Sequence, residues 1–219
     1  IGGLAGRIRN TTIENCYTKG TVSGNTKVGG LTGTAADARI KYCYSASSVS
    51  GTGATAGFIG QTTGTSELQN NIALGNQSRQ YKFDGATAAD ASGGYQNNFE
   101  YEENRGIPAT DRTDVNLTGK IETASKAQIT AASFYTGTLG WQEEIWDLST
   151  VGEEKTPKLK GLDPNETSEI AVYHGTISSV EEFETELTEH PDGVFSIEKN
   201  LDFGGNAYTI GSVVVPGTF

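Results

Sequence analysis

The sequence predicts an all-β protein organised around a right-handed parallel β-helix, and three observations lead to this prediction. The motif GGLAG at residues 2–6 returns as GGLTG at residues 29–33, a step of 27 residues. A degraded copy, AGFIG, follows at residues 56–60. Short segments with β-branched and aromatic residues alternate with Gly, Thr, Ser and Asn, a composition typical of strands and turns. Repetition at a fixed step predicts stacked structural units instead of one globular core.

The coils of this solenoid are predicted over residues 1–83. Each unit of about 27 residues holds three short strands, which we expect to pair in parallel with the neighbouring units. In the third unit the pattern drifts by one residue, so that Leu68, Asn71 and Ile72 take the equivalent positions. The pairs that recur between the first two units are Ile13 and Ile40, Cys16 and Cys43, Tyr17 and Tyr44, Val22 and Val49, and Gly24 and Gly51.

Equivalent residues of successive coils are expected to stack as a structural ladder. Its members are Gly3, Gly30, Gly57, Cys16, Cys43, Tyr17 and Tyr44. We expect the glycines to make tight corners with positive φ, since glycine alone adopts that conformation without a steric cost. The ladder would give a stiff rod.

The two cysteines, Cys16 and Cys43, occupy the same place in consecutive coils. Stacking brings their Cα atoms to about 5 Å, which lies within the range of a disulfide. The sequence is therefore compatible with two alternatives, a disulfide between the two cysteines and a buried ladder of free thiols. Asn71 in the third coil ends the ladder of thiols.

Residues 84–162 change pattern and predict irregular excursions followed by an aromatic cap. The stretch up to residue 120 is polar and poorly periodic, and a short helix is expected within residues 124–135. The densest aromatic cluster of the chain then contains Phe134, Tyr135, Leu139, Trp141, Ile145, Trp146 and Leu148. We interpret this cluster as a cap over the last coil. The alternative is that Trp141 and Trp146 stack on a sugar or protein ligand, which would require exposed indoles, whereas a cap buries them.

Residues 163–219 predict a linker, a short helix and the first strands of a following solenoid unit. The polar stretch DPNETSE marks the boundary. Ser178 or Ser179 is expected to cap a helix that stops at Pro191. Residues 207–219 resemble the first rungs of another β-helix.

Charge and hydropathy restrict the partners of the chain. The formal net charge is -11 and the isoelectric point is about 4.6. Nucleic acid is not an expected partner, because phosphate binding needs clustered Lys and Arg. No apolar run approaches the length of a membrane span, so we expect no membrane insertion. The chain starts at Ile1, inside a repeat, and we therefore expect neighbouring domains of a longer parent chain.

No catalytic, cofactor-binding or metal site is predicted. The zinc-peptidase motif HExxH does not occur, and His174 and His190 have no second histidine at ligand spacing. The cysteines fall in a regular strand ladder, away from any activating histidine.

Charged residues at coil-equivalent positions give no catalytic column either. Glu14 lies over Lys41 and predicts a surface pair, and Asp37 and Arg39 stand alone in their columns. A polysaccharide lyase or hydrolase on a β-helix would need several such groups together, so this function is disfavoured.

Calcium is the one cofactor that the acidic composition leaves open. Asp84 and Asp90, or Asp111 and Asp114, could supply oxygen ligands, but their spacing matches no known calcium loop. Solvated loop carboxylates are the favoured interpretation.

The succession of GGLAG, IENCYTKGTVSG, VGGLTG and IKYCYSASSVSG resembles the GLUG repeat of bacterial cell-surface proteins. Similar stretches flank streptococcal immunoglobulin A metallopeptidases and occur in adhesin-like proteins. The resemblance covers residues 1–72 well and is looser beyond them. It implies a secreted or wall-associated protein with a β-helical stalk or platform, and it implies no catalysis in this segment.

Three functions are therefore open. The favoured one is a noncatalytic extracellular structural or adhesive module of a large bacterial surface protein, with a host protein or glycan as partner. The alternative is an accessory region that positions a glycoprotein substrate, such as immunoglobulin A, for a secreted zinc metallopeptidase. The weakest is a β-helical polysaccharide-active enzyme.

Overall fold

The computed structural model describes residues 1–75, 81–85, 94–104, 120–153, 155–162, 173–177, 179–189, 194–197, 208–210 and 213–215. The chain forms two compact units, Ile1–Ile170 and Ala171–Phe219. The predicted coils and the predicted excursions with the aromatic cluster both fall within the first unit.

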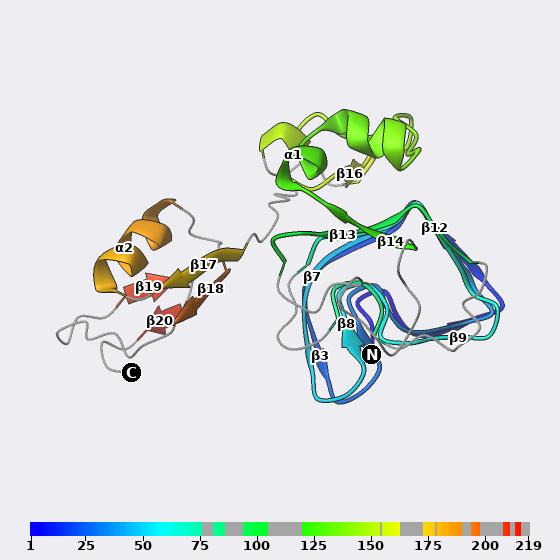
Figure 1. The fold of residues 1–219 in the computed structure, drawn as a ribbon, viewed down its shortest axis with the longest axis horizontal. Coiled ribbons are helices and arrows are strands. Elements are labelled where there is room, and N and C mark those ends of the chain that lie inside the picture. Colours follow the sequence, from blue (N-terminus) through cyan, green and yellow to red (C-terminus); the bar gives the residue numbers. More distant parts are fainter. Residues whose placement is uncertain are drawn as a thin grey trace. The chain divides into compact units, whose positions relative to one another are not determined.

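Three parallel sheets build the solenoid of the first unit (Figure 1). The first sheet contains β1 (Ala5–Arg9), β5 (Thr32–Ala36) and β9 (Thr62–Thr63). The second contains β2 (Thr12–Glu14), β6 (Arg39–Lys41), β10 (Glu67–Gln69) and β12 (Tyr95–Gln96). The third contains β3 (Tyr17–Gly24), β7 (Tyr44–Gly51), β11 (Ile72–Ala73), β13 (Asn98–Tyr101) and β14 (Ile121–Ala124). A short pair, β4 (Val28–Gly29) and β8 (Thr55–Ala56), follows the third sheet in the turn. The parallel β-solenoid is thus confirmed, with about three turns about 27 residues apart.

The register between the coils follows the sequence repeat. From the first coil to the second, Tyr17 pairs with Tyr44 and Glu14 with Lys41. The third coil is displaced by one residue, because Ile72 also pairs with Tyr44, 28 positions earlier. This confirms the predicted drift.

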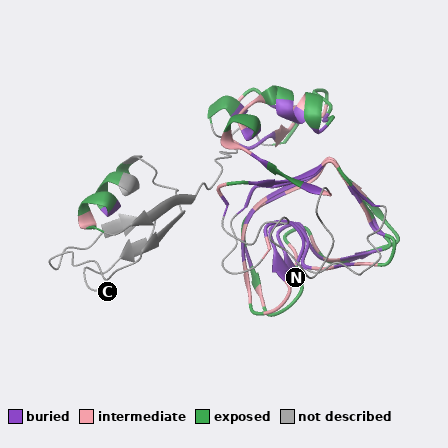
Figure 2. Cartoon of the chain, in the orientation of Figure 1, coloured by how far each residue is buried: buried purple, intermediate pink, exposed green. Residues whose placement is uncertain are grey.

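Figure 2 colours the buried residues of the coils purple. The apolar ones among them form the core of the solenoid. The rings of Phe58 and Phe83 stack with their centroids 4.8 Å apart. Leu31, Ile40 and Leu68 are also fully buried. Each such side chain stabilises the fold by roughly 1.5–3 kcal/mol relative to an exposed one.

The glycines of the ladder serve close approach between coils, not the corners for which they were predicted. The amide of Gly3 donates to the carbonyl of Gly30 over 3.1 Å. A Cβ on Gly30 would lie 2.0 Å from the carbonyl oxygen of Gly57, too close for any side chain. None of the three has positive φ. Among the described residues that have positive φ are other glycines, including Gly20 and Gly64, and four asparagines, which tolerate it through their short polar side chains.

Residues 125–162, here called the lateral segment, follow β14. They contain α1 (Lys126–Ile129), a π-helical turn η2 (Phe134–Thr138), β15 (Trp146–Asp147), a 3-10 turn η3 (Val151–Glu153) and β16 (Lys158–Leu159). Ser125 caps α1 in a reciprocal capping box with Gln128, as the sequence pattern of a helix start requires. β15 and β16 pair antiparallel. In Figure 1 the coils lie over one another and the lateral segment lies beside them, on the side of β13 and β14.

The second unit contains a β–α–β arrangement and a hairpin. β17 (Tyr173–Ile177) and β18 (Val194–Ile197) pair in parallel around α2 (Val180–Glu189). The hydroxyl of Ser179 accepts a hydrogen bond from the amide of Glu182, so Ser179 caps α2. β19 (Tyr208–Ile210) and β20 (Val213–Val215) pair antiparallel, unlike the parallel rungs of a β-helix. His174 lies in β17, and His190 lies outside the described residues.

Candidate functional site

One corner of the solenoid carries a column of residues with left-handed backbone. Asn15, Tyr42, Asn70 and Asn97 each follow a strand of the second sheet, with φ of 52°, 54°, 59° and 54°. The side-chain amide of Asn97 donates to Oδ1 of Asn70 over 2.7 Å. The same amide donates to the carbonyl of Thr138 in the lateral segment over 2.5 Å. The corner therefore presents stacked polar groups to the side of the solenoid.

The two tryptophans of the chain bind to this corner column. Nε1 of Trp146 donates to Oδ1 of Asn15 in the first coil over 3.2 Å. Nε1 of Trp141 donates to the carbonyl oxygen of Asn70 in the third coil over 2.9 Å. The aromatic cluster thus runs along the flank of the stack, whereas a cap over the last coil was predicted. The reason is that the corner offers hydrogen-bond acceptors at the spacing of the coils.

Aromatic stacking supplies the apolar part of this contact. The rings of Tyr17 and Tyr44 in adjacent coils are nearly parallel, with centroids 5.0 Å apart and an angle of 6°. The ring centroid of Trp146 lies 5.8 Å from that of Tyr44, and the centroids of Trp141 and Trp146 are 4.4 Å apart. Each pair of this kind is worth about 0.5–1.5 kcal/mol beyond the area that it buries.

The indoles that the sequence left open as ligand-stacking groups lie in the interior. Trp141 is 2% exposed and Trp146 is 1% exposed, and their neighbours in the cluster are other aromatic rings. Burial also raises the pKa of Tyr135, whose hydroxyl donates to the carbonyl of Ile129. Burial is the property that distinguishes a packing role from ligand stacking.

A second column lies on the inner side of the same corner. Its members are Cys16, Cys43, Asn71 and Asn98. The amide of Cys16 donates to Sγ of Cys43 over 3.4 Å, and the amide of Cys43 donates to Oδ1 of Asn71 over 3.0 Å. Nδ2 of Asn71 donates to Oδ1 of Asn98 over 2.9 Å. The ladder of thiols ends at Asn71 as expected, but the column continues in amide chemistry.

The two thiols are free and differ in environment. The hydrogen bond with Cys43 lowers the pKa of Cys16 to about 7, and Cys16 is only partly buried. Burial raises the pKa of Cys43 well above its ordinary value. Cys16 is therefore the more nucleophilic thiol of the pair.

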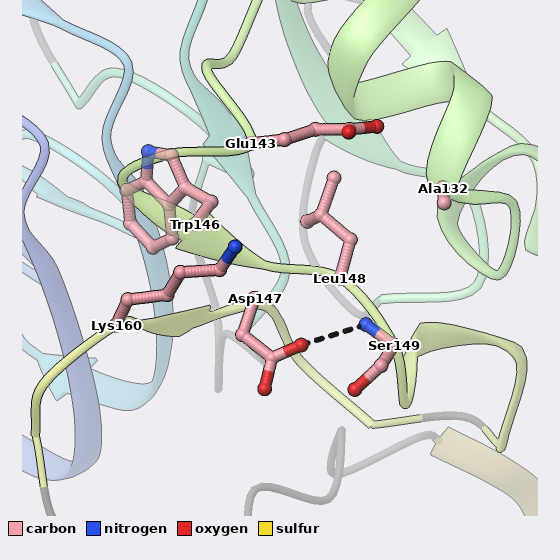
Figure 3. A pocket seen from close by; sticks show the side chains of 7 residues that line it. All are labelled: Ala132, Glu143, Trp146, Asp147, Leu148, Ser149 and Lys160. Carbon is pink, nitrogen blue, oxygen red and sulfur yellow. Dashed lines mark hydrogen bonds between the residues drawn. The ribbon is translucent and has the colours of Figure 1, made fainter.

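A pocket of about 270 Å³ lies beside β15 (Figure 3). It is lined by Ala132, Glu143, Trp146, Asp147, Leu148, Ser149 and Lys160. The amide of Ser149 donates to Asp147 over 3.0 Å and lowers the pKa of that carboxyl, with smaller contributions from Lys160 and Lys158. The pocket combines buried apolar walls with exposed charges of both signs.

A polar groove of about 540 Å³ lies over the opposite end of the second-sheet strands. It is lined by Asn10, Thr11, Thr12, Asp37, Arg39, Thr65 and Glu67. Nε of Arg39 lies 2.8 Å from Oε2 of Glu67, and this bond lowers the pKa of Glu67. Oδ1 of Asp37 accepts from the amide of Thr65 over 3.0 Å. The prediction that Arg39 stands alone among the charged residues is wrong, because the drift of the third coil brings Glu67, 28 residues later, beside it.

Of the residues weighed as calcium ligands, Asp84 lies within the described part of the chain and Asp90, Asp111 and Asp114 lie outside it. Asp84 is buried, and its Oδ2 accepts from the hydroxyls of Thr62 and Tyr95. Among the residues that the structure describes, no three His, Cys, Asp or Glu side chains gather into a group that could hold a metal ion.

Comparison with known proteins bears on the first coil. Residues 1–23 match a family model described as the GLUG motif. This segment is similar to the GLUG motif. The GLUG match spans β1, β2 and most of β3, so it corresponds to one coil, and the next coil repeats the GLUG pattern in register. No curated protein and no solved structure matches the chain.

The described residues include no helix that is both long enough and apolar enough to span a bilayer.

Sequence reasoning about the coils missed the corner column and the ion pair of Arg39 with Glu67. Asn15, Asn70 and Asn97 recur near the coil step, and this spacing was the available signal. The pairing of Arg39 with Glu67 becomes visible in the sequence only when the third coil is aligned with its extra residue.

Proposed function

We propose that this chain is a noncatalytic structural module of a bacterial surface protein, located outside the cell and serving as a stalk or platform. The observation that carries the proposal is a GLUG-type coil stacked in continuous register and fastened along one flank by the lateral segment. A module of this kind transmits shape and force from one part of a parent chain to another.

The stiffness of such a rod follows from its contacts. Neighbouring coils share eight consecutive register partners between β3 and β7. Trp146 is bonded to the first coil and Trp141 to the third. To separate two coils, a force must break the strand ladder and the lateral contacts together.

A noncatalytic role is supported by how the acidic groups of the solenoid are used. Glu67 is bonded to Arg39, Asp37 to the amide of Thr65, and Asp84 to two hydroxyls. In each case the carboxylate accepts hydrogen bonds within the fold.

The polar groove is the surface that best suits a partner. Its threonine hydroxyls, the Asn10 amide and the Arg39–Glu67 pair can donate to and accept from a hydroxyl-rich glycan or a polar segment of a host protein. A noncatalytic platform would present this groove to a partner at the end of the second-sheet strands opposite the corner column.

Location and mechanics test the proposal. Antibodies raised against the chain should label intact, unpermeabilised cells of the source organism. In single-molecule pulling, the first unit should unfold at a distinctly higher force than the Trp146→Ala variant, which keeps the coils and loses the lateral bond to Asn15. Labelling only after permeabilisation would refute the location. Hydrolysis or elimination of a polysaccharide by the purified chain would refute the noncatalytic role.

A further inference from the structure

Cys16 and Cys43 are placed so that a bond between them would join the first two coils. Each follows a residue of the corner column and directly precedes a register pair, because Tyr17 pairs with Tyr44. Adjacent parallel strands lie about 4.8 Å apart, and disulfides join residues whose Cα atoms are about 4.4–6.8 Å apart. Sγ of Cys43 already lies 3.4 Å from the amide of Cys16.

The environments of the two thiols assign them different roles. Cys16 is partly exposed, so a small reagent can reach it, whereas Cys43 has no exposed surface. The thiolate of Cys16 is available near neutral pH, since its hydrogen bond with Cys43 lowers its pKa. Cys16 is therefore suited to attack first, and Cys43 to resolve the product.

The position of Cys16 and Cys43 in the stack determines what a disulfide between them would stabilise, namely the contact between the first and second coils. Among the described strands, β1, β2 and β3 are edge strands of their sheets, and each pairs with a strand of the second coil. Further along the same column, Asn71 and Asn98 join their coils by hydrogen-bonded amides. Between the first two described coils, the thiols of Cys16 and Cys43 take the place of these amides.

We propose that Cys16 and Cys43 are a redox-sensitive clip that covalently fastens the first coil to the second. The thiolate of Cys16 attacks a low-molecular-weight disulfide RSSR, forming a mixed disulfide and releasing RS⁻. Cys43 then loses its proton and attacks Sγ of Cys16, forming the Cys16–Cys43 bond and releasing a second RS⁻. Two protein thiols are oxidised, one RSSR is reduced, and both leaving groups are protonated to RSH. This inference is independent of the proposed function.

The test compares the whole chain after equilibration with oxidised glutathione and with dithiothreitol. Intact mass should show the loss of two hydrogens in the oxidised sample, and non-reducing peptide mapping should show Cys16 joined to Cys43. The apparent Tm should be about 5–10 °C higher in the oxidised sample, since the bond closes a loop of moderate length. The Cys16→Ser variant should show no such difference, and the same wild-type protein in two redox states makes the comparison independent of any folding defect in a variant.

Other outcomes overturn the inference. A stable glutathione adduct on Cys16 would show that Cys43 cannot resolve it. A dimer joined through two copies of Cys16 would show that the thiol prefers a second chain. A Cys16–Cys43 bond that leaves the Tm unchanged would refute its role as a clip.

Discussion

Replacing Gly30 by alanine tests whether the coils are as close as the structure shows. The added Cβ would lie 2.0 Å from the carbonyl oxygen of Gly57 and 2.0 Å from Oγ of Ser45. The serine hydroxyl can rotate away, but the carbonyl belongs to the backbone of the next coil. The second and third coils must therefore move apart at this position.

The cost follows from the bonds that such a movement weakens. The backbone amide of Gly30 donates to the carbonyl oxygen of Ala56 over 3.1 Å, and that of Leu31 donates to the carbonyl oxygen of Phe58 over 2.8 Å. Loss of two hydrogen bonds costs about 1–3 kcal/mol, and overpacking adds about 1–3 kcal/mol. We expect the free energy of unfolding to fall by about 3–5 kcal/mol, which lowers the Tm of a unit of this size by about 6–20 °C.

Gly6→Ala is the matched control. Gly6 ends the first copy of the same motif, and a Cβ there meets no atom within 4 Å. Its free energy of unfolding should change by less than about 0.5 kcal/mol. Thermal melts followed by far-ultraviolet circular dichroism, together with urea titrations, measure both variants. Equal melting of the two variants would show that the coils do not approach each other at Gly30.

Three further predictions concern the flank, the inner column and the thiols. Trp146→Ala should lower the free energy of unfolding by about 3–5 kcal/mol in urea titration, because it removes a buried indole and its bond to Asn15; a loss below about 1 kcal/mol would contradict the lateral contact. Asn71→Ala should lower the free energy of unfolding by about 2–4 kcal/mol in urea titration, because the buried backbone amide of Cys43 loses its acceptor. An unchanged free energy of unfolding would contradict the role of Asn71 in the inner column. Iodoacetamide labelling, followed by mass spectrometry, should modify Cys16 at a rate that is half-maximal near pH 7, because its lowered pKa makes the thiolate available at lower pH. Cys43 should stay unmodified until the chain unfolds, because it is buried. Equal labelling of both thiols would refute their difference in burial.

The solenoid was predictable from the sequence because every coil faces the same steric requirement at the same position. A Cβ on Gly3 or Gly30 would collide with the backbone of the next coil, and Tyr17 and Tyr44 share a register, so the requirement appears as a repeat. The reason for the glycines was harder to infer. Close approach between coils and positive φ both select glycine, and the backbone angles of the folded chain distinguish the two causes.

The flank could not be predicted in the same way. The lateral segment has no repeat of its own, and its placement depends on Trp146 reaching Asn15, 131 residues earlier in the chain. The aromatic density of the segment predicted a buried cluster but carried no information about its position along the stack. The ion pair of Arg39 was missed for a simpler reason, because an alignment at a constant step of 27 residues places Glu67 one column away.

The lateral segment also fixes the number of coils between its two anchor points, Asn15 and Asn70. Repeat arrays commonly gain or lose units by duplication and deletion, since each unit contacts only its neighbours. Here Trp146 and Trp141 are bonded to coils at two different heights. Deleting the coil between them would shift Asn15 by about 4.8 Å along the stack relative to Trp146. A hydrogen bond of 3.2 Å does not survive such a shift. A change in the number of coils between Asn15 and Asn70 therefore requires a matching change in the spacing of the two indoles.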